Sequence, residues 1–141
     1  MSRISLEQAN ALIAAALAKA KTLGLNPLTV AVLDAGGHVI ALQRQDGGSN
    51  LRPQIAIAKA GGALALGVSS RRIGEMAVDR PTFVAALGSI SPQGVLPAAG
   101  GVILIDAEGA PIGAVGITGD TSDNDEICAL AGAAAAGLKT Q

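Results

Sequence analysis

The sequence predicts an α+β fold in which strands gathered in hairpins form an antiparallel sheet. Two segments that begin 72 residues apart share one pattern, Leu33–Ala41 and Ile105–Gly113: an apolar run, an Asp-Ala-x-Gly turn and a second apolar run. Each pattern is typical of a β-hairpin, because glycine supplies the positive φ of a short turn and aspartate hydrogen-bonds its own backbone. Apolar residues at helical spacing flank and separate the two hairpins. Strands that come in hairpins, rather than singly between helices, favour an antiparallel sheet.

The first predicted element is a helix that begins after Ser5 and ends near Gly24. Ser5 and Gln8 form a capping-box pattern, and glycine suits a helix C-terminus. The strands of the first hairpin follow, over about Leu28–Asp34 and His38–Arg44. Apolar residues at helical spacing give the helix one apolar face: Leu6, Ala9, Ile13, Ala16, Leu17 and Ala20.

Two or three helices are predicted between the hairpins, after a polar, glycine-rich loop over residues 45–50. Pro53 stands in the first turn of a helix that extends to about residue 66, and a second helix begins at residue 69 or 70 and extends to about 78. Asp79 is the expected cap of a third, which has proline in its first turn and ends at residue 88. Gly61-Gly62 is unfavourable inside the first of these helices. Close approach to a neighbouring backbone or to a flat ligand would explain this pair.

The second hairpin is predicted over residues 102–106 and 111–118, after a loop rich in glycine and proline. The last predicted helix covers Thr121–Leu138, and its alanines and glycines leave apolar surface on every side. Such a helix is usually buried twice, once in its own domain and once by a partner subunit. We therefore expect a homo-oligomer.

Composition excludes several classes of function. The 141 residues are expected to form one domain over residues 1–141, and a formal net charge of −1 does not favour a polyanionic partner. Phe83 is the only aromatic residue, so a surface that stacks nucleic-acid bases is not expected. No apolar run approaches the roughly 20 residues of a membrane-spanning helix. Neither nucleic acid nor a membrane is therefore an expected partner.

The single cysteine, Cys128, lies in the alanine-rich last helix, where the simplest interpretation is a small buried hydrophobic residue. It cannot form an internal disulfide, and a lone thiol fits a reducing compartment. We expect a soluble, cytoplasmic protein.

His38, the only histidine, stands in the turn of the first hairpin. An imidazole there can ligate haem iron or another metal, or act as acid and base near neutral pH. The alternative is an ordinary polar turn residue. Because there is no second histidine and no cysteine cluster, a zinc site made only of protein ligands is not expected.

An acidic run over residues 120–126 begins the last helix. It lacks the central glycine and the late glutamate of an EF-hand, and acids at a helix N-terminus are explained by capping and by the helix dipole. Asp125 is the residue of this run that we consider for a base or hydrogen-bond acceptor facing a pocket.

Several basic residues lie near the predicted ends of strands and helices: Arg44, Arg52, Lys59, Arg71 and Arg72. Guanidinium groups bind carboxylates with two parallel hydrogen bonds, so these residues are candidates for an acidic ligand. Solvated surface charge is the alternative for each of them.

Several short motifs occur in one order over nearly the whole chain: Val32–His38, Arg44, Asp46-Gly47, Ile55-Ala56, Lys59-Ala60, Gly100-Gly101, Ile112–Gly119 and Asp125-Glu126. In these motifs and their order, the chain resembles the haem-binding GlcG/HbpS family, which includes the C-terminal domain of the PduO-type corrinoid adenosyltransferase. The resemblance implies a profilin-like α–β–α sandwich around a five-stranded antiparallel sheet, and assembly into dimers or larger closed oligomers such as an octamer. It also implies haem binding, with slow haem degradation in some members.

The first functional hypothesis is therefore a haem-binding protein. His38 would be the axial ligand of the iron, as the resemblance implies, and Arg44 or Arg52 would meet the haem propionates. The porphyrin would lie against the glycine-rich end of the sheet or at a subunit interface.

The second hypothesis is a cofactor-independent enzyme of the isomerase or tautomerase type, or an accessory protein, that acts on an organic acid in a catabolic pathway. Arg44 or Lys59 would hold the carboxylate of this small molecule beside Gly100 and Gly101, and Asp125 or His38 would move a proton. A structural or regulatory subunit is the third possibility.

Overall fold

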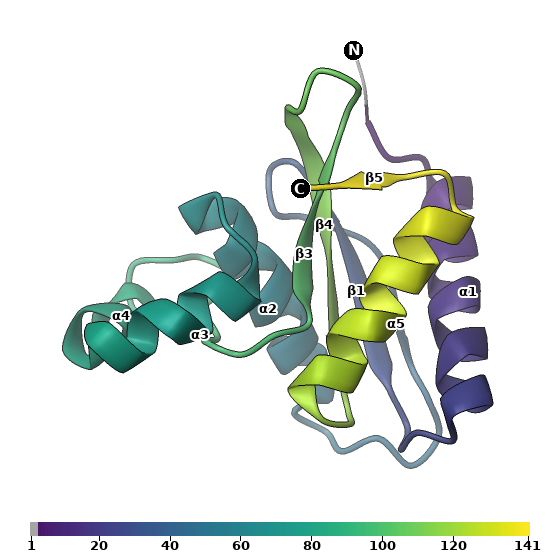
Figure 1. Ribbon diagram of the computed structural model, residues 1–141, viewed down its shortest axis with the longest axis horizontal. Coiled ribbons are helices and arrows are strands. Elements are labelled where there is room, and N and C mark those ends of the chain that lie inside the picture. Colours follow the sequence, from purple (N-terminus) through teal and green to yellow (C-terminus); the bar gives the residue numbers. More distant parts are fainter. Residues whose placement is uncertain (1–2) are drawn as a thin grey trace.

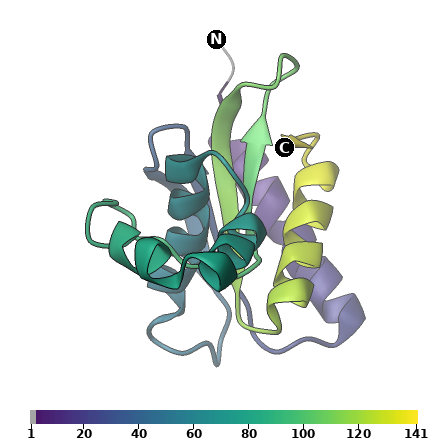
Figure 2. The same ribbon diagram turned by 60° about the vertical axis from the view of Figure 1, so that its left-hand side comes forward.

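Three layers make up the fold in the computed structural model, which describes residues 3–141 (Figure 1). Helices α1 (Leu6–Leu23) and α5 (Ser122–Ala135) cover one face of a five-stranded antiparallel sheet, and α2 (Arg52–Leu66) covers the other. Helices α3 (Ser70–Asp79) and α4 (Pro81–Leu87) extend outward on the α2 side (Figures 1 and 2). The predicted α+β class and the α–β–α sandwich are confirmed.

The strands lie in the order β2-β1-β4-β3-β5, so the two predicted hairpins sit side by side. The pairing of β1 with β4 joins them, with Thr29 opposite Thr118 and Asp34 opposite Gly113. Each hairpin carries a register irregularity one or two residues before its turn. The strands are β1 (Thr29–Asp34), β2 (Val39–Arg44), β3 (Gly101–Ile105), β4 (Pro111–Thr118) and β5 (Lys139–Thr140).

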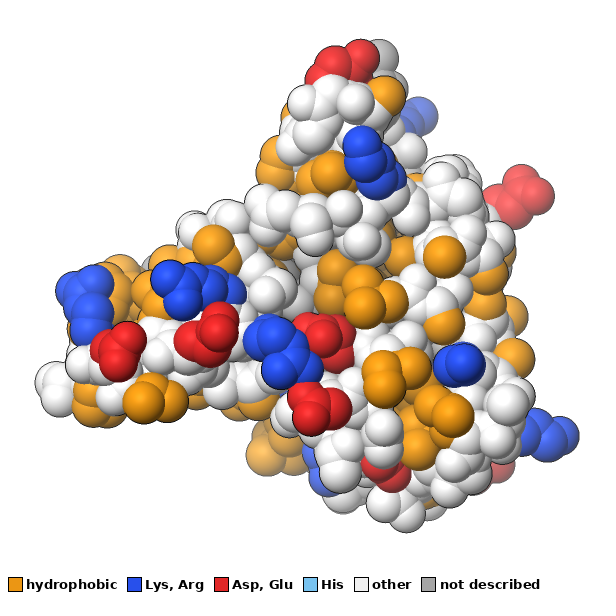
Figure 3. Space-filling model, viewed as in Figure 1, with side chains coloured by type: hydrophobic (Ala, Val, Ile, Leu, Met, Phe, Trp, Pro, Cys, Tyr) orange, Lys and Arg blue, Asp and Glu red, His pale blue; other side chains and the backbone are white. Residues whose placement is uncertain are grey.

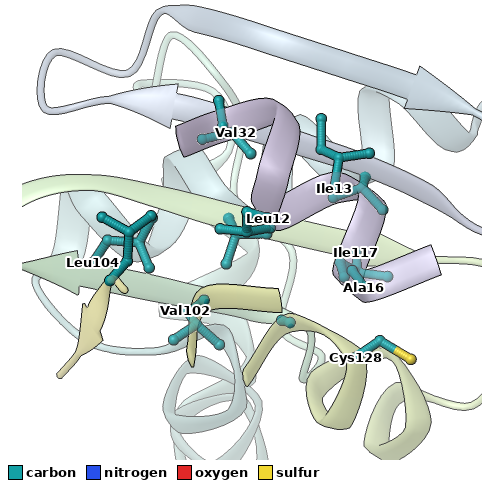
Figure 4. Packing of buried hydrophobic residues seen from close by; sticks show 14 of the residues in the cluster. Leu12, Ile13, Ala16, Val32, Val102, Leu104, Ile117 and Cys128 are labelled. Carbon is teal, nitrogen blue, oxygen red and sulfur yellow. The ribbon is translucent and has the colours of Figure 1, made fainter. Parts of the chain in front are cut away.

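The main hydrophobic core lies between the sheet and the α1–α5 pair (Figure 4). Leu12 and Ile13 of α1 are fully buried, and they pack against branched side chains from the facing strands. Cys128 of α5 is also fully buried in this core, as predicted, and burial raises the pKa of its thiol. Other core residues that Figure 4 labels are Ala16, Val32, Val102, Leu104 and Ile117.

On the other face, glycines let the backbone of α2 rest directly on the sheet. A Cβ on Gly116 would overlap the carbonyl oxygen of Ala56, and one on Gly101 would overlap the carbonyl oxygen of Lys59. The Gly61-Gly62 pair of α2 is covered by the segment after α4, since a Cβ on Gly61 would overlap the side chain of Gln93. The chain's own backbone, rather than a flat ligand, occupies that space.

Two helix ends differ from the sequence prediction. Helix α5 ends at Ala135 instead of residue 138, because Gly137 adopts φ +71° and turns the chain into β5. Asp79 does not cap α4, because it is the last residue of α3 and Arg80 takes the capping position. No helix within residues 3–141 is long and apolar enough to cross a membrane.

Candidate functional site

The first hairpin turn holds His38 beside a carboxylate. Asp34 Oδ1 accepts backbone hydrogen bonds from Gly36 (2.9 Å) and from His38 itself (3.0 Å), which closes the turn. His38 Nδ1 lies 3.4 Å from the same oxygen, and 78% of the imidazole side chain is exposed. The backbone hydrogen bond from His38 is the main reason that the pKa of Asp34 is lowered, so this carboxylate stays ionised near neutral pH.

This arrangement fits a metal ligand. Histidines that bind metals usually donate one ring N–H to a carboxylate or carbonyl, which fixes the tautomer and leaves the other nitrogen for the metal. With Nδ1 facing Asp34, Nε2 of His38 is the nitrogen that remains for a metal. The site can therefore offer one oriented imidazole nitrogen to iron.

The second hairpin turn has the same geometry without the imidazole. Asp106 Oδ1 accepts from the backbone N–H of Glu108 (3.0 Å) and of Ala110 (2.9 Å). Gly109 has φ +86°, close to the +84° of Gly37 in the first turn. Ala110 occupies the place of His38, so the chain carries one copy of the turn with an imidazole and one without.

Arg44 and Arg52 lie at the opposite end of β2 from His38. His38 and Arg44 are six residues apart along the strand, or about 20 Å at ~3.3 Å per residue. Arg52 Nη1 donates to Thr118 Oγ1 (2.8 Å), and Arg44 Nη1 donates to Asn50 Oδ1 (3.1 Å). Within one chain, therefore, these two residues do not flank a ligand held by His38.

Lys59 and Asp125 form a buried ion pair between α2 and the start of α5. Lys59 Nζ lies 3.1 Å from Asp125 Oδ2 and donates to the carbonyl oxygen of Ile117 (2.9 Å), while Asp125 Oδ1 accepts from the backbone N–H of Asp120 (3.0 Å). Their side chains are 3% and 1% exposed. Burial lowers the pKa of Lys59 and raises that of Asp125, because it disfavours both charged forms.

The Lys59–Asp125 pair has a structural role, because it links α2 to the start of α5. Neither group reaches solvent, so neither is accessible to a substrate that would need a carboxylate held or a proton moved. Gly100, at φ +127°, and Gly101 fit tightly beneath Lys59, and Ser70 Oγ accepts from the backbone N–H of Gly101 (2.7 Å). The space beside these two glycines, where a ligand was predicted to bind, is thus occupied by Lys59 of α2.

The remaining acids of the run over residues 120–126 serve the local fold. Asp120 accepts from the backbone N–H of Asn26 and from the side chain of Asn124, and the latter bond is the main reason that its pKa is lowered. Asp123 and Glu126 pair with Arg71 on the surface, in a region where Figure 3 shows charges of both signs side by side. Within residues 3–141, no three His, Cys, Asp or Glu side chains gather as a metal site would require.

Two surface grooves lie away from the histidine. A groove of about 770 Å³ runs between α1 and the segment after β2, with Leu17, Lys21 and Pro27 in its lining. A second, of about 510 Å³, lies beside the β3–β4 hairpin and is lined by Arg3 and Lys139 among others. His38 lines neither groove.

Sequence reasoning missed the burial of Lys59, and it did not predict the buried hydroxyls of Thr29, Thr118 and Ser70. Lys59 lies three residues after Ala56 and one before Ala60, on the face of α2 that packs against the sheet. That helical spacing predicts burial, and burial of a lysine requires a carboxylate partner. The threonines and the serine carried no comparable pattern.

Comparisons with known proteins agree with this fold. Residues 4–134 match the family model described as "Haem degrading protein HbpS-like". A solved structure of a PduOC:haem complex has 25% identity and a TM-score of 0.86, covering 99% of both chains. HbpS has 31% identity and a TM-score of 0.81, over 95% of this chain and 90% of that one.

Protein ORFY of Klebsiella pneumoniae is also similar, with 27% identity and a TM-score of 0.85 over 97% of this chain and 93% of that one. A search of curated protein sequences finds no match.

Proposed function

We propose that this chain, which belongs to the family of haem degrading, HbpS-like proteins, binds haem with His38 as an axial ligand of the iron. The observation that carries the proposal is the likeness to the PduOC:haem complex over 99% of both chains. The Asp34–His38 contact supports it from the chain's own residues, since it orients one imidazole nitrogen outward.

Residues in and around the turn would hold the imidazole of His38 in place. Asp34 holds Nδ1 of the imidazole and so sets the tautomer, and Gly37, at φ +84°, lets the turn close around that carboxylate. The side chain of Gln93 packs against Gly37 and supports the turn from the α2 side. Haem, when bound, supplies redox chemistry that none of these side chains provides.

Titration of haemin into the metal-free protein tests the proposal. Because the chain has no Trp or Tyr, the apo protein barely absorbs at 280 nm, so nearly all absorption above that wavelength comes from haem. We expect a saturable, red-shifted Soret band in the wild type and its loss in His38→Ala. Asp34→Asn should weaken haem binding by about tenfold, as removal of a partner behind a metal ligand typically does. Identical titration of His38→Ala and the wild type would remove His38 from the site.

We also propose that the protein is a homo-oligomer and that a second subunit completes the haem site. The imidazole is 78% exposed, and a haem bound there needs apolar cover on both faces. Large apolar side chains lie exposed on the outward-extending α3–α4 region and on α5, where Figure 3 shows apolar patches: Val78, Phe83, Ile90, Ile127 and Leu130. Analytical ultracentrifugation should find a dimer or larger assembly, and a monomer with full haem affinity would contradict this proposal.

We extend the proposal to slow haem degradation, which the family description supports. The loaded protein, incubated with a reductant and oxygen, should lose its Soret band faster than an equal concentration of free haemin. Equal rates would restrict the function to binding.

A further inference from the structure

One edge of strand β2 pairs with no other strand of the chain, because β2 stands at the end of the order β2-β1-β4-β3-β5. Within residues 3–141, no loop or helix makes a backbone hydrogen bond with Val39–Arg44 on that edge. The backbone N–H of Gln45 donates inward, to the carbonyl oxygen of Leu28. Alternation along the strand therefore directs the N–H and C=O groups of Arg44 and Leu42 outward, toward the free edge.

This free edge is suited to pairing with another strand. It contains neither proline nor lysine, the residues that protect many exposed edges, and its register irregularity lies at the turn end. Its residues from Val39 to Leu42 are all apolar, and Val39 is 50% exposed. Native proteins rarely leave an apolar edge of this length open, so we expect it to be covered.

At the Arg44 end, this edge borders an apolar groove with two cations. The groove of about 770 Å³ lies on the α1 side and includes residues 44–46 in its lining, and its size is typical of small-molecule sites. Its cations, Lys21 and Arg44, have no carboxylate within ion-pair distance among residues 3–141. Asp46 is the one acid in the lining, whose larger apolar side chains are Leu17, Leu25 and Pro27.

At the other end, the same edge carries the imidazole on the same side of the sheet. Val30 and Val32 belong to the core beneath α1, so Asp34, two residues further along β1, also lies on the α1 side. His38 is in contact with Asp34 there. The two ends of β2 thus hold complementary halves of a haem site. One half has a metal ligand without apolar cover, and the other has apolar cover and cations without a metal ligand.

We propose that β2 pairs antiparallel with β2 of a second copy of the chain, and that the two copies share each haem site. This inference rests on the proposed binding of haem by His38. Pairing about a two-fold axis perpendicular to the sheet joins unlike ends of the strand and keeps both α1 layers on one side. With the axis at Ala41, His38 stands opposite Arg44 of the second copy. With the axis at Leu42, it stands opposite Asp46 of the second copy, so both registers place the groove beside the imidazole.

The residues then divide the binding of haem between the two copies. His38 of one copy supplies the iron ligand, and the apolar lining of the groove in the other copy covers the ring. Lys21 and Arg44 of that second copy bind the propionates through charge-assisted hydrogen bonds. Unlike charges also meet at both ends of the interface, because the Asp34 carboxylate of each copy faces the cations of the other. This arrangement explains why Arg44 and His38 are far apart within one chain.

Complementation between two defective variants tests the shared site. His38→Ala keeps the groove, and Lys21→Glu/Arg44→Glu keeps the imidazole, so neither variant alone should show the wild-type Soret band with haemin. When both are coexpressed with different tags and purified through both tags, each mixed dimer holds one intact site. The mixed dimers should therefore bind about half as much haem as the wild type. Arg72→Glu, at an exposed site on α3, is the matched control for the charge reversals and should bind like the wild type.

A proline in β2 tests the interface itself. Leu42→Pro removes an N–H that faces the free edge, so it spares the pairing of β2 with β1 but blocks pairing with a second copy. In analytical ultracentrifugation this variant should sediment at about half the mass of the wild-type assembly. Its affinity for haemin should fall by at least about tenfold, because the groove of the second copy is lost. Leu42→Ala, which keeps the N–H, should retain the wild-type mass.

The outcomes separate this inference from the proposed function. If the wild type binds haemin but the mixed dimers do not, each site lies within one chain and the inference is overturned. Wild-type haem affinity of Lys21→Glu/Arg44→Glu would overturn it as well, as would an unchanged mass of a folded Leu42→Pro variant. A wild type that binds no haemin would instead overturn the proposed function.

Discussion

At the hairpin end of the sheet, the Asp34–His38 contact joins two residues of one turn, whereas at the opposite end the Lys59–Asp125 contact joins residues from two different layers. Asp34 and His38 are four residues apart, and their contact is largely exposed. Lys59 and Asp125 are 66 residues apart, and their contact is almost fully buried. The hairpin end leaves an imidazole exposed to solvent, while the buried ion pair at the other end links α2, β4 and α5.

The comparison shows which polar residues are available for function. A buried ion pair loses much stability when one partner is removed, so its residues are constrained by the fold. An exposed turn tolerates change, as the second hairpin demonstrates with Ala110 in the place of His38. Four predictions test this contrast.

Removal of one partner of the buried pair should have the largest effect. Lys59→Met leaves the Asp125 carboxylate buried and unpaired, and the free energy of unfolding should fall by about 3–5 kcal/mol in urea denaturation. Lys21→Met, at an exposed site at the end of α1, should change it by less than about 0.5 kcal/mol. If the two variants are equally stable, the pair does not hold the fold together.

A double variant separates the loss of the ion pair from the burial of one unpaired charge. Lys59→Met combined with Asp125→Leu removes both charges, so it should recover most of the stability lost by Lys59→Met alone. Additive losses in the double variant would mean that the pair itself is not the source of the effect.

Close packing of α2 on the sheet gives the second prediction. Gly116→Ala should destabilise the protein by about 1–3 kcal/mol, because its Cβ overlaps the carbonyl oxygen of Ala56. Gly88→Ala is the control, since it has helical φ and open space around it, and should be neutral or stabilising by up to about 1 kcal/mol. Thermal unfolding of both variants is the measurement. It separates the clash of a Cβ with the backbone of α2 from the effect that replacing any glycine by alanine has on stability.

Exchange of the imidazole between the two turns tests the hairpin end. His38→Ala combined with Ala110→His places the only histidine beside Asp106 in the second turn. We expect no recovery of haem binding, because Gly109 has no neighbouring side chain, whereas Gln93 packs against Gly37 in the first turn. Full recovery would show that the turn alone, without its surroundings, makes the site.

The smallest effect concerns the pH dependence of the exposed turn. The pKa of Asp34 is lowered in the folded protein, so its contribution to stability is complete above pH ~4, near the unfolded value, and is lost as the pH falls through the folded pKa. Asp34→Asn should therefore be less stable than the wild type at neutral pH, and the difference should shrink below pH ~4. A constant difference at all pH values would assign the effect to packing instead.

Local patterns in the sequence predicted the local structure. Both Asp-Ala-x-Gly turns form as expected, with positive φ at Gly37 and Gly109, and the capping box of Ser5 and Gln8 is present. Cys128 is buried as its helical context indicated. These features depend on residues close in sequence, so the local sequence pattern is enough to predict them.

Contacts between distant segments were not predictable in the same way. Asp125 was considered as a base or hydrogen-bond acceptor facing a pocket, yet it is buried against a lysine that comes from another layer. The pairing of Thr29 with Thr118 depends on the register between β1 and β4, which a single sequence does not reveal. Strand β5 is two residues long, too short to leave a periodic pattern.

Chemical rescue of the His38→Ala variant tests the haem assignment most directly. The Soret spectrum of haemin with this variant should differ from that of the wild type, and added free imidazole should restore the wild-type spectrum by replacing the missing side chain. A variant that shows the wild-type spectrum before any imidazole is added would contradict the assignment of His38 to the iron.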